Sequence, residues 1–328
     1  MLYRTWILLL AFLLVAIPCI PSPSFAEEED DKLRLQLYKT VGAFTAVPWY
    51  YLAAVDRYER NVRNSRRDIP DIKEGISIYY SPDEWAGALN PNQEDTDPFS
   101  IQLFGGVGMD GNGDGKADRT NNEDVLYTFA YFLQAYGANE EDIKIGLWDF
   151  YQRDKTVSMI VGFANIINQT GKISFDERRF PLPLHANYSY RSTWGDRRGF
   201  GGLRIHEGTD IFAGYGVPVR ATTHGFIEMK GWNKFGGWRV GIRDMNNVYH
   251  YFAHLSGFEK GLEVGKIVKP GDVIGYVGSS GYGKPGTQGK FPPHLHYGTY
   301  RDNGISEWSF DPYPYLRSWE RMERRSRR

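Results

Sequence analysis

The chain has 328 residues, and its 39 lysines and arginines nearly balance 40 aspartates and glutamates. A net charge of −1 gives no reason to expect nucleic-acid binding, which calls for a basic surplus. The length suggests two domains.

The N-terminus has the pattern of a secretory signal peptide, predicted here as residues 1–26. Arg4 precedes an apolar run from Trp6 to Ile20, and Ser24-Phe25-Ala26 follows as a small-X-small cleavage signal. We expect export and cleavage after Ala26. The alternatives are an uncleaved membrane anchor, for which the run is short of about 20 residues, and a lipoprotein at Cys19, which follows a proline where a small residue is expected.

Cys19 is the only cysteine, so a chain cleaved after Ala26 has no internal disulfide. We expect the mature protein to be held together by its core alone. It is expected outside the cell or in the cell wall, with no stable membrane span left after cleavage.

Residues 32–171 are predicted to form a mainly α-helical domain. Apolar residues recur at helical spacing in three segments, Pro48–Glu59, Asp124–Tyr136 and Asp142–Asn168. A connector is predicted over residues 172–190, because Pro181-Leu182-Pro183-Leu184 favours extended backbone.

The loop that begins at Asp110 has the spacing of a calcium-binding loop. Oxygen-bearing side chains alternate and a glycine stands at the sixth position, as in an EF-hand. The predicted ligands are Asp110, Asn112, Asp114, the carbonyl of Lys116, and Asp124. The usual glutamate at position twelve is replaced by Asn121. The alternative is a glycine-rich turn of solvated acids.

Residues 191–316 are predicted to form a β-rich domain. Short apolar or alternating runs are separated by glycine, proline or asparagine. These runs are Val217–Ala221, Gly225–Lys230, Trp238–Arg243, Val248–Ala253 and Val273–Val277. We expect an antiparallel sandwich or barrel-like sheet, so that the whole chain is an α+β protein with a helical half followed by a β-rich half.

Residues 317–328 are predicted to form a basic tail, because six of them are arginines. Contact with anionic wall polymers or membrane and a solvated helix are the two alternatives for this tail.

Side chains typical of a zinc site lie between residues 203 and 300. His206 and Asp210 are four residues apart, His254 follows, and His294 and His296 flank one leucine. Catalytic zinc usually takes three nitrogen or oxygen ligands and keeps a fourth position for water. On a strand, side chains two residues apart point to the same face, so one histidine of the last pair could bind metal while the other contacts water. The pattern predicts a zinc hydrolase.

This part of the chain resembles the lysostaphin-type zinc endopeptidases of bacterial cell walls. The matching segments run in the family's order and are Trp194-Gly195, His206–Ile211, Gly216–Ala221, Ala253-His254-Leu255, Val268–Gly275 and Pro293–His296. The resemblance implies that His206, Asp210 and His296 bind zinc and that His254 and His294 are catalytic. It also implies a groove across the sheet, which would suit an extended peptide.

The expected chemistry divides work between the metal and the two catalytic histidines. Zinc polarises the scissile carbonyl and makes a water nucleophilic near neutral pH. We expect His294 to act as general base and His254 to orient the water or stabilise the oxyanion, with exchanged roles as the alternative. In a second alternative both His294 and His296 bind zinc and the site is closed and structural.

Three further histidines, His185, His224 and His250, match no motif of the family. We interpret them as surface or core histidines. His250 would share a strand face with His254 if that strand is regular.

The helical half resembles lytic transglycosylases over Val47–Glu59 and over the Asp110–Asp118 loop with its following helix. The resemblance places Glu59 where that family has its acid, which must be protonated to act as a donor. Arg60 replaces the usual serine, and the Gly-X-Met-Gln segment of the family is absent. Arg57 and Arg60 are expected to lower the pKa of Glu59.

We therefore favour a helical domain that binds glycan or supports the peptidase, in which Glu59 is an exposed helix acid paired with an arginine. Glycan cleavage by Glu59 is the alternative.

The sequence predicts a secreted, zinc-dependent peptidoglycan endopeptidase, with Ca²⁺ as a second ion at the Asp110 loop. The layout most resembles sporulation-associated wall peptidases of spore-forming bacteria. That resemblance implies cleavage between L-Ala and D-Glu of the stem peptide in spore cortex, and a location that includes the forespore envelope. The alternatives are a non-catalytic wall-binding or activator protein, and a bifunctional enzyme that also cleaves glycan.

Overall fold

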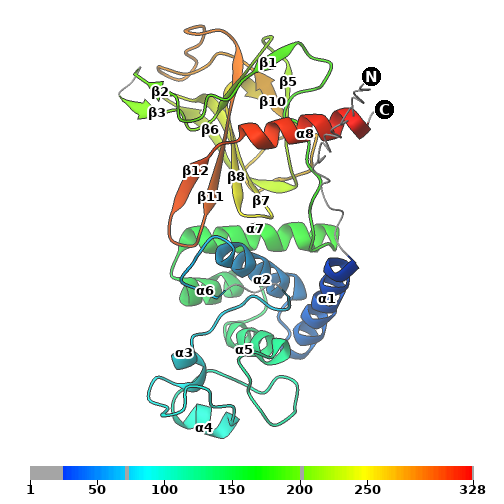
Figure 1. Cartoon of the computed structure of the whole chain (residues 1–328), viewed down its shortest axis with the longest axis vertical. Coiled ribbons are helices and arrows are strands. Elements are labelled where there is room, and N and C mark those ends of the chain that lie inside the picture. Colours follow the sequence, from blue (N-terminus) through cyan, green and yellow to red (C-terminus); the bar gives the residue numbers. More distant parts are fainter. Residues whose placement is uncertain (1–24, 71–73, 200–202, 327–328) are drawn as a thin grey trace, which may run out of the picture.

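The computed structural model describes residues 25–70, 74–199 and 203–326. Residues 1–24 of the predicted signal peptide lie outside this range. In the part of the chain that is described, no helix is both long and apolar enough to cross a membrane. A helical half and a sheet half follow one another along the long axis of the molecule (Figure 1).

The helical half contains every described helix but one. Its helices are α1 (Phe25–Thr45), α2 (Trp49–Arg63), α3 (Pro82–Ala86), α4 (Pro98–Leu103), α5 (Asn122–Gln134), α6 (Glu140–Tyr151) and α7 (Asp154–Thr170). Side chains of Asn121 and Asn139 accept hydrogen bonds from backbone N–H groups at the starts of α5 and α6. Such caps satisfy donors that have no partner inside the helix.

The segment predicted as one helical stretch, Asp142–Asn168, is two helices, so its predicted continuity was wrong. After α6, Gln152 adopts left-handed backbone (φ 49°) and its N–H bonds to the carbonyl of Trp148. Such a residue ends a helix and is usually glycine or asparagine. Because glutamine stands here, no glycine or asparagine marks the break in the sequence.

The second half is an antiparallel sheet, as predicted. Its main path runs β1-β4-β11-β8-β7-β6-β9, while β10 pairs with β5 and β8, and β12 pairs with β11. The strands are β1 (Tyr188–Tyr190), β4 (Thr209–Ala213), β5 (Pro218–Arg220), β6 (Gly225–Asn233), β7 (Gly237–Asp244), β8 (Val248–Phe258), β9 (Ile267–Val268), β10 (Val273–Val277), β11 (His294–Asp302) and β12 (Glu307–Phe310). A separate ladder joins β2 (Arg197–Arg198) to β3 (Arg204–Ile205). Each of the five predicted strand runs corresponds to one of these strands.

The described chain has two apolar cores, one in each half. Along the sequence, the change from the first core to the second falls between Phe175 and Phe180. Phe175 belongs to the helical core, whereas Phe180 and Leu182 are buried in the core of the sheet half. The range predicted as a connector, 172–190, therefore contributes to both cores and ends in β1.

The C-terminal range differs from the separate tail that was predicted, because it lies in the packed helix α8 (Tyr313–Ser326). Leu316 and Trp319 belong to the core of the sheet half, and the carboxylate of Glu323 pairs with Arg220 at 3.1 Å. The exposed side of such a helix carries its charged residues, so the segment is basic in composition even though its other side is apolar and packed.

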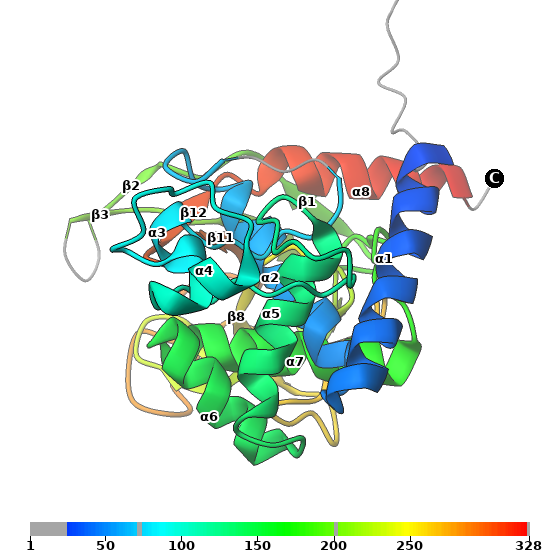
Figure 2. The same ribbon diagram turned by 90° about the horizontal axis from the view of Figure 1, so that it is seen from below.

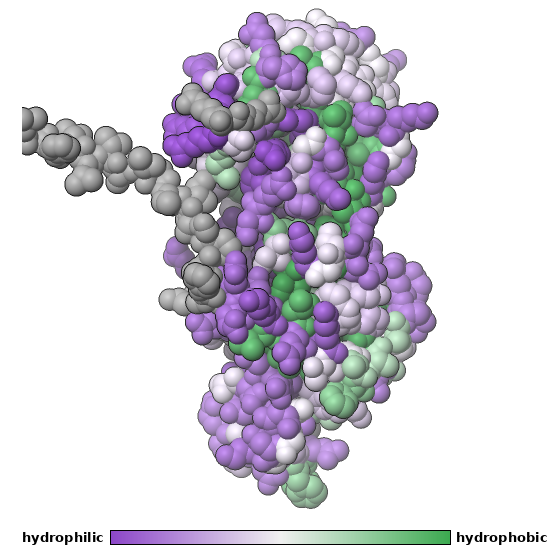
Figure 3. Space-filling view, turned by 90° about the vertical axis from the view of Figure 1, so that its right-hand side faces the viewer, coloured by the Kyte–Doolittle hydropathy of each residue, from purple (hydrophilic) through white to green (hydrophobic). Residues whose placement is uncertain are grey.

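The two halves share a packed boundary, where α7 lies between the sheet and the other helices of the helical half (Figures 1 and 2). Phe226 of β6 joins the helical core, and it packs so closely that a Cβ at Gly162 of α7 would come within 2.2 Å of its ring. Arg153 holds the buried carboxylate of Asp302 with two contacts, at 3.0 and 2.6 Å. The face seen in Figure 3 is mostly hydrophilic, with scattered apolar patches over both halves.

Candidate active site

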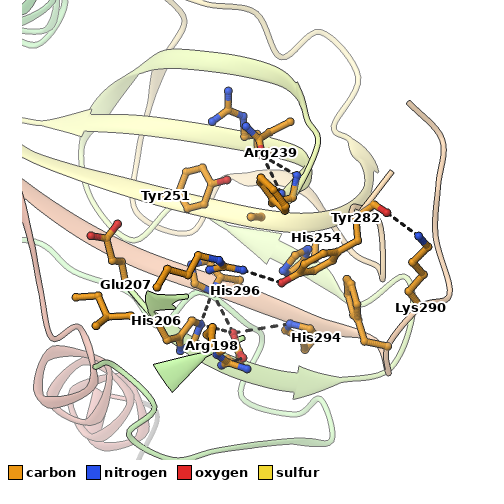
Figure 4. Close-up of a pocket in the computed structure, with 18 of the residues that line it drawn as sticks. Arg198, His206, Glu207, Arg239, Tyr251, His254, Tyr282, Lys290, His294 and His296 are labelled. Atoms are coloured by element: carbon orange, nitrogen blue, oxygen red, sulfur yellow. Dashed lines mark hydrogen bonds and ion pairs between the residues drawn. The ribbon is translucent and has the colours of Figure 1, made fainter. Parts of the chain in front are cut away.

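Two neighbouring strands bring the predicted zinc ligands together (Figure 4). Asp210 on β4 and His296 on β11 are direct partners in the antiparallel register, and directly opposed side chains have Cβ atoms about 4.5–5.5 Å apart. His206 precedes β4 and reaches the same point from the adjoining loop. The sheet therefore closes a separation of 86 residues between Asp210 and His296.

The three ligand atoms are spaced to fit one zinc ion. His206 Nε2 lies 2.8 Å from His296 Nδ1 and 3.1 Å from Asp210 Oδ1, and His296 Nδ1 lies 3.0 Å from the same oxygen. Ligand atoms around tetrahedral zinc lie roughly 3.3 Å from one another, since each is about 2.0–2.1 Å from the metal. Among the residues described, these three make the one metal-sized cluster of His, Cys, Asp or Glu side chains.

His294 lies beside this cluster without joining it. Its Nε2 is 3.7 Å from Asp210 Oδ1, farther than any distance among the three ligand atoms. The geometry therefore favours an open site with three protein ligands over the closed four-ligand alternative.

Backbone groups orient the ligands from behind. His206 Nδ1 lies 2.9 Å from the carbonyl oxygen of Thr193. A carbonyl only accepts, so Nδ1 carries the hydrogen and the lone pair of Nε2 is free to bind a metal. The Thr193 hydroxyl in turn accepts from the backbone N–H of Asp210 at 3.2 Å. Thr193 was missed in the sequence because its carbonyl is a group that any residue type carries, and because its hydroxyl contacts a residue 17 positions away.

Gly208 has to be a glycine for a spatial reason. A Cβ at this position would lie 2.6 Å from His296 Cε1 and 2.6 Å from the carbonyl oxygen of Tyr297. Glycine at position 208 thus leaves room for the His296 ring and for the backbone of β11. It is not there to allow a left-handed turn.

The carboxylate of Asp210 is held in its charged form. Burial by itself would raise the pKa of Asp210, but the neighbouring imidazoles of His206, His296 and His294 outweigh it and keep the pKa far below its usual range. Its second oxygen, Oδ2, pairs with Arg198 at 2.8 Å. One oxygen therefore faces the histidines while the other is fixed by a cation.

The two predicted catalytic histidines, His254 and His294, are each held by a backbone carbonyl. His254 Nδ1 lies 2.8 Å from the carbonyl oxygen of Ser280, and His294 Nδ1 lies 2.9 Å from that of Pro292. Each ring therefore carries its hydrogen on Nδ1 and keeps Nε2 as the basic atom. Their ring centroids are 4.8 Å apart.

Burial lowers the pKa of both rings. The pKa of His254 falls to about 3, with a further contribution from His294 and His296, and that of His294 also lies below its usual value. Both imidazoles are thus neutral at neutral pH, which is the form a general base requires.

The strand that carries His254 is irregular, which separates it from His250. His254 has a left-handed backbone (φ 62°), and β8 shifts register against β7 nearby. Bulges of this kind often re-aim a side chain beside an active site. His250 instead lies in the core, where its Nδ1 is 2.6 Å from the Tyr297 hydroxyl. The two histidines therefore do not share a face.

The two remaining unassigned histidines lie away from the cleft. His185 is exposed, and the His224 ring packs against Phe175 with centroids 5.3 Å apart. These positions agree with their interpretation as surface or core histidines.

The five site residues line a cleft of about 1030 Å³. Its walls carry four cationic side chains, Arg198, Arg204, Arg239 and Lys290. Figure 4 shows Arg239 and Tyr251 on the side of the cleft opposite Arg198. Two acidic side chains, Glu207 and Glu307, also line it, so the cleft offers charged partners of both signs to a ligand, with cations in the majority.

Glu59 differs from its prediction in exposure. It lies on α2 with only 8% of its surface exposed, so the expected exposed acid paired with an arginine was wrong. Arg57 turns away and donates to the carbonyl of Met245 at 2.7 Å, while Arg60 donates to the carbonyl of Gly75.

The pKa of Glu59 also moves opposite to the prediction. Burial raises it to about 7, against the lowering effects of a hydrogen bond from Tyr151 and the charge of Arg63. The Tyr151 hydroxyl donates to Glu59 Oε1 at 2.7 Å. A lowered pKa was predicted because Arg57 and Arg60 are close to Glu59 along the chain. Residues this close in a helix can point to different sides, so these two arginines do not set the environment of the carboxyl group.

The predicted calcium loop is organised by its own backbone. Asp110 accepts hydrogen bonds from Gly113 and Gly115 N–H groups, and Asp124 accepts from three others. Asn121, where an EF-hand has glutamate, instead caps α5. In the described chain no second cluster of acidic side chains reaches metal spacing, so calcium binding stays a prediction.

Comparison with known proteins places these residues in a family. Residues 204–309 match the model of Peptidase family M23. The chain is 60% identical over 319 residues to the L-Ala--D-Glu endopeptidase of Bacillus subtilis (strain 168), covering 97% of this chain and 98% of that protein. Lysostaphin of Staphylococcus simulans is 34% identical over 116 residues, which is 35% of this chain and 22% of lysostaphin. A solved structure of that antimicrobial peptidase aligns with a TM-score of 0.36 and 29% identity, covering 45% of this chain and 56% of the other.

Proposed function

The chain belongs to peptidase family M23, and on this premise we propose that it is a secreted, zinc-dependent endopeptidase that cleaves the L-Ala–D-Glu bond of peptidoglycan stem peptides. One observation carries the catalytic part: three ligand atoms from His206, Asp210 and His296 lie within 3.1 Å of one another in an open cleft. The choice of bond is supported by the similarity to the Bacillus subtilis enzyme, which extends over both halves.

The donor set fits zinc, with His206, Asp210 and His296 as its ligands. When bound, zinc would polarise the scissile carbonyl and help to activate a water molecule. Asp210 holds its charge and balances that of the metal. The hydrogen bond from His206 to Thr193 keeps the ligand nitrogen aimed into the site.

His294 and His254 move and stabilise charge in this proposal. We assign His294 as general base, because its Nε2 lies near Asp210 Oδ1, at 3.7 Å, and its Nδ1 is occupied by the carbonyl of Pro292. The ring centroid of His254 lies 4.8 Å from that of His294 and 5.9 Å from that of His296. We assign His254 to orient the water or stabilise the developing oxyanion. The Phe291 ring packs on both imidazoles, with centroids 4.7 and 5.0 Å away, and limits their rotation.

The charge of the cleft supports an acidic stem peptide as substrate. D-Glu brings a carboxylate next to the scissile bond, and the cleft offers Arg204, Arg239 and Lys290 besides the arginine bound to Asp210. The same wall also carries Glu207 and Glu307, so these cations attract the substrate carboxylate as individual charges.

Mass spectrometry of purified peptidoglycan digested by the mature protein tests this proposal. New N-terminal D-Glu ends should appear, and they should be lost in His206→Ala and after chelation with EDTA. The matched control His185→Ala should produce the same ends as wild type. A zinc-loaded protein that leaves the wall unchanged would support a binding or activator protein instead.

A further inference from the structure

One acidic side chain of the zinc cleft has no cationic partner. The acids that line the cleft are Glu207, Asp210 and Glu307. Asp210 is paired with an arginine at 2.8 Å, and Glu307 is paired with Arg243 at 2.7 Å and with Lys155 at 2.8 Å. Among the described residues, no basic side chain makes an ion pair with Glu207, which is exposed. Its negative charge is therefore left for a ligand to pair with.

The Glu207 carboxylate is directed along the cleft and away from the metal ligands. Its Oε2 accepts a hydrogen bond from the Tyr300 hydroxyl at 3.3 Å. Tyr300 lies four residues beyond His296 on β11, which is about 13 Å along a strand. Figure 4 shows Glu207 and Lys290 at opposite ends of the site. The cleft thus has an acid at one end and a base at the other.

The floor of the cleft beside Glu207 is aromatic. The ring centroid of Tyr300 lies 6.0 Å from that of Tyr249 and 6.5 Å from that of Tyr251. Gly298 comes between His296 and Tyr300 on the same face of β11. A Cβ at this glycine would lie 2.8 Å from the carbonyl oxygen of Glu207 and 3.2 Å from the Tyr300 ring. The glycine therefore leaves no side chain between the metal ligand and the tyrosine.

A carboxylate at the edge of tyrosine rings suits an ammonium group. The carboxylate attracts the cation as a charge, and the electron-rich ring faces attract it as well. One of these rings already has a cation over it, since the guanidinium carbon of Arg239 lies 5.9 Å from the Tyr251 centroid. An anionic group would be repelled by Glu207. This end of the cleft therefore favours the opposite charge from the end that carries Lys290.

We propose that Glu207 is a specificity-determining residue, which selects stem peptides whose residue after D-Glu carries a side-chain ammonium, as a diamino acid does. This inference rests on the proposed function, because it takes the L-Ala–D-Glu bond as the bond that is cut. Two extended residues span about 7 Å, and the side chain of a diamino acid adds to that reach. The ammonium can thus come to Glu207 and Tyr300 while the scissile bond stays at the metal.

Two synthetic peptides that differ in one ammonium group test the proposal. They are N-acetyl-L-Ala-γ-D-Glu-L-Lys and the same peptide with norleucine in place of lysine, and acetylation removes the terminal amine. The full zinc-loaded chain should cleave the lysine peptide with a kcat/KM about threefold or more above that for the norleucine peptide, as expected for one solvent-exposed ion pair. Glu207→Gln should bring this ratio close to one, and Glu207→Lys should bring it below one.

Glu263→Gln is the matched control. The Glu263 side chain is 75% exposed and pairs with Lys230, outside the cleft wall, so this variant should keep the ratio of wild type. Zinc content by atomic emission checks that the Glu207 variants retain the adjacent ligand His206. The ratio isolates the ammonium, because a change that only loosened the site would lower both rates together. A ratio of one in wild type, or an unchanged ratio in Glu207→Gln, would overturn the proposal.

The same peptides separate this proposal from the proposed function. If both are cut at equal rates, the peptidase stands and the role of Glu207 falls. If neither is cut, the proposed function fails, and titration calorimetry of the two peptides with wild type and Glu207→Gln then decides on Glu207. Tighter binding of the lysine peptide by wild type alone would support its role, and equal binding of the two peptides by wild type would reject it.

Discussion

His206 Nδ1 lies 2.9 Å from the backbone carbonyl oxygen of Thr193. This contact fixes the tautomer of the imidazole and leaves Nε2 for the metal. The same residue accepts from the backbone N–H of Asp210, so Thr193 positions two of the three ligands at once. The proposed metal site is thus organised by the fold itself, which is the usual role of groups behind metal ligands.

Replacing His206 by alanine should abolish zinc binding and peptidase activity. Loss of the metal removes a contribution of several kcal/mol to catalysis, so kcat/KM should fall by about 10³-fold or more. Metal content by atomic emission and cleavage of a soluble stem peptide measure the two effects. His185→Ala should retain both, and a fully active His206→Ala would reject the assigned ligand set.

Gly208→Ala should weaken zinc binding without removing any ligand. The new Cβ would press on the His296 ring and displace its metal-binding nitrogen, so we expect about 10–100-fold lower affinity. Competition with a chromophoric chelator measures it. Gly214→Ala is the control, since a Cβ there meets nothing closer than 3.7 Å. Equal affinity in the two variants would contradict the spatial role of Gly208.

Arg204→Gln should raise KM for the stem peptide by about fivefold and change kcat little. Arg204 lines the cleft, and an exposed cation contributes about 1 kcal/mol to binding an anion. Arg197→Gln provides the control, because Arg197 lies on the same two-stranded ladder but not in the cleft wall. The difference should shrink at high salt, as expected for screened charges.

Glu59 should make the fold less stable as pH rises from about 4.5 to 7. Its folded-state pKa of about 7 exceeds the ordinary value of 4.5, so the native state retains a proton that the unfolded chain has lost. The stabilisation is fully present below pH 4.5 and is lost by pH 7, on the order of 3 kcal/mol. Urea unfolding of wild type and Glu59→Gln across this range measures it.

In that comparison Glu59→Gln should lack this part of the pH dependence and be the more stable protein at pH 8. Parallel stability curves for the two proteins would show that Glu59 ionises freely in the folded state.

Local patterns were enough to predict the strands of the sheet half, whereas the set of zinc ligands came from the family resemblance. Alternation along β6 to β8 marks strands because side chains on a strand point alternately to two faces. The pair His294 and His296 marked one face of β11 for the same reason. The spacing from His206 to Asp210 and the family resemblance supplied the rest of the metal cluster.

The sequence by itself determined which residue types could bind a metal and which segments form strands, because both depend on residues close along the chain. Only the tertiary structure decided the contacts that cross it. The backbone carbonyl of Thr193 that orients His206, the bulge that turns His254 away from His250, and the burial that raises the pKa of Glu59 all depend on distant segments that fold against one another. Solvent exclusion and strand register are properties of the packed chain, and they cannot be inferred from residues that are adjacent in the sequence.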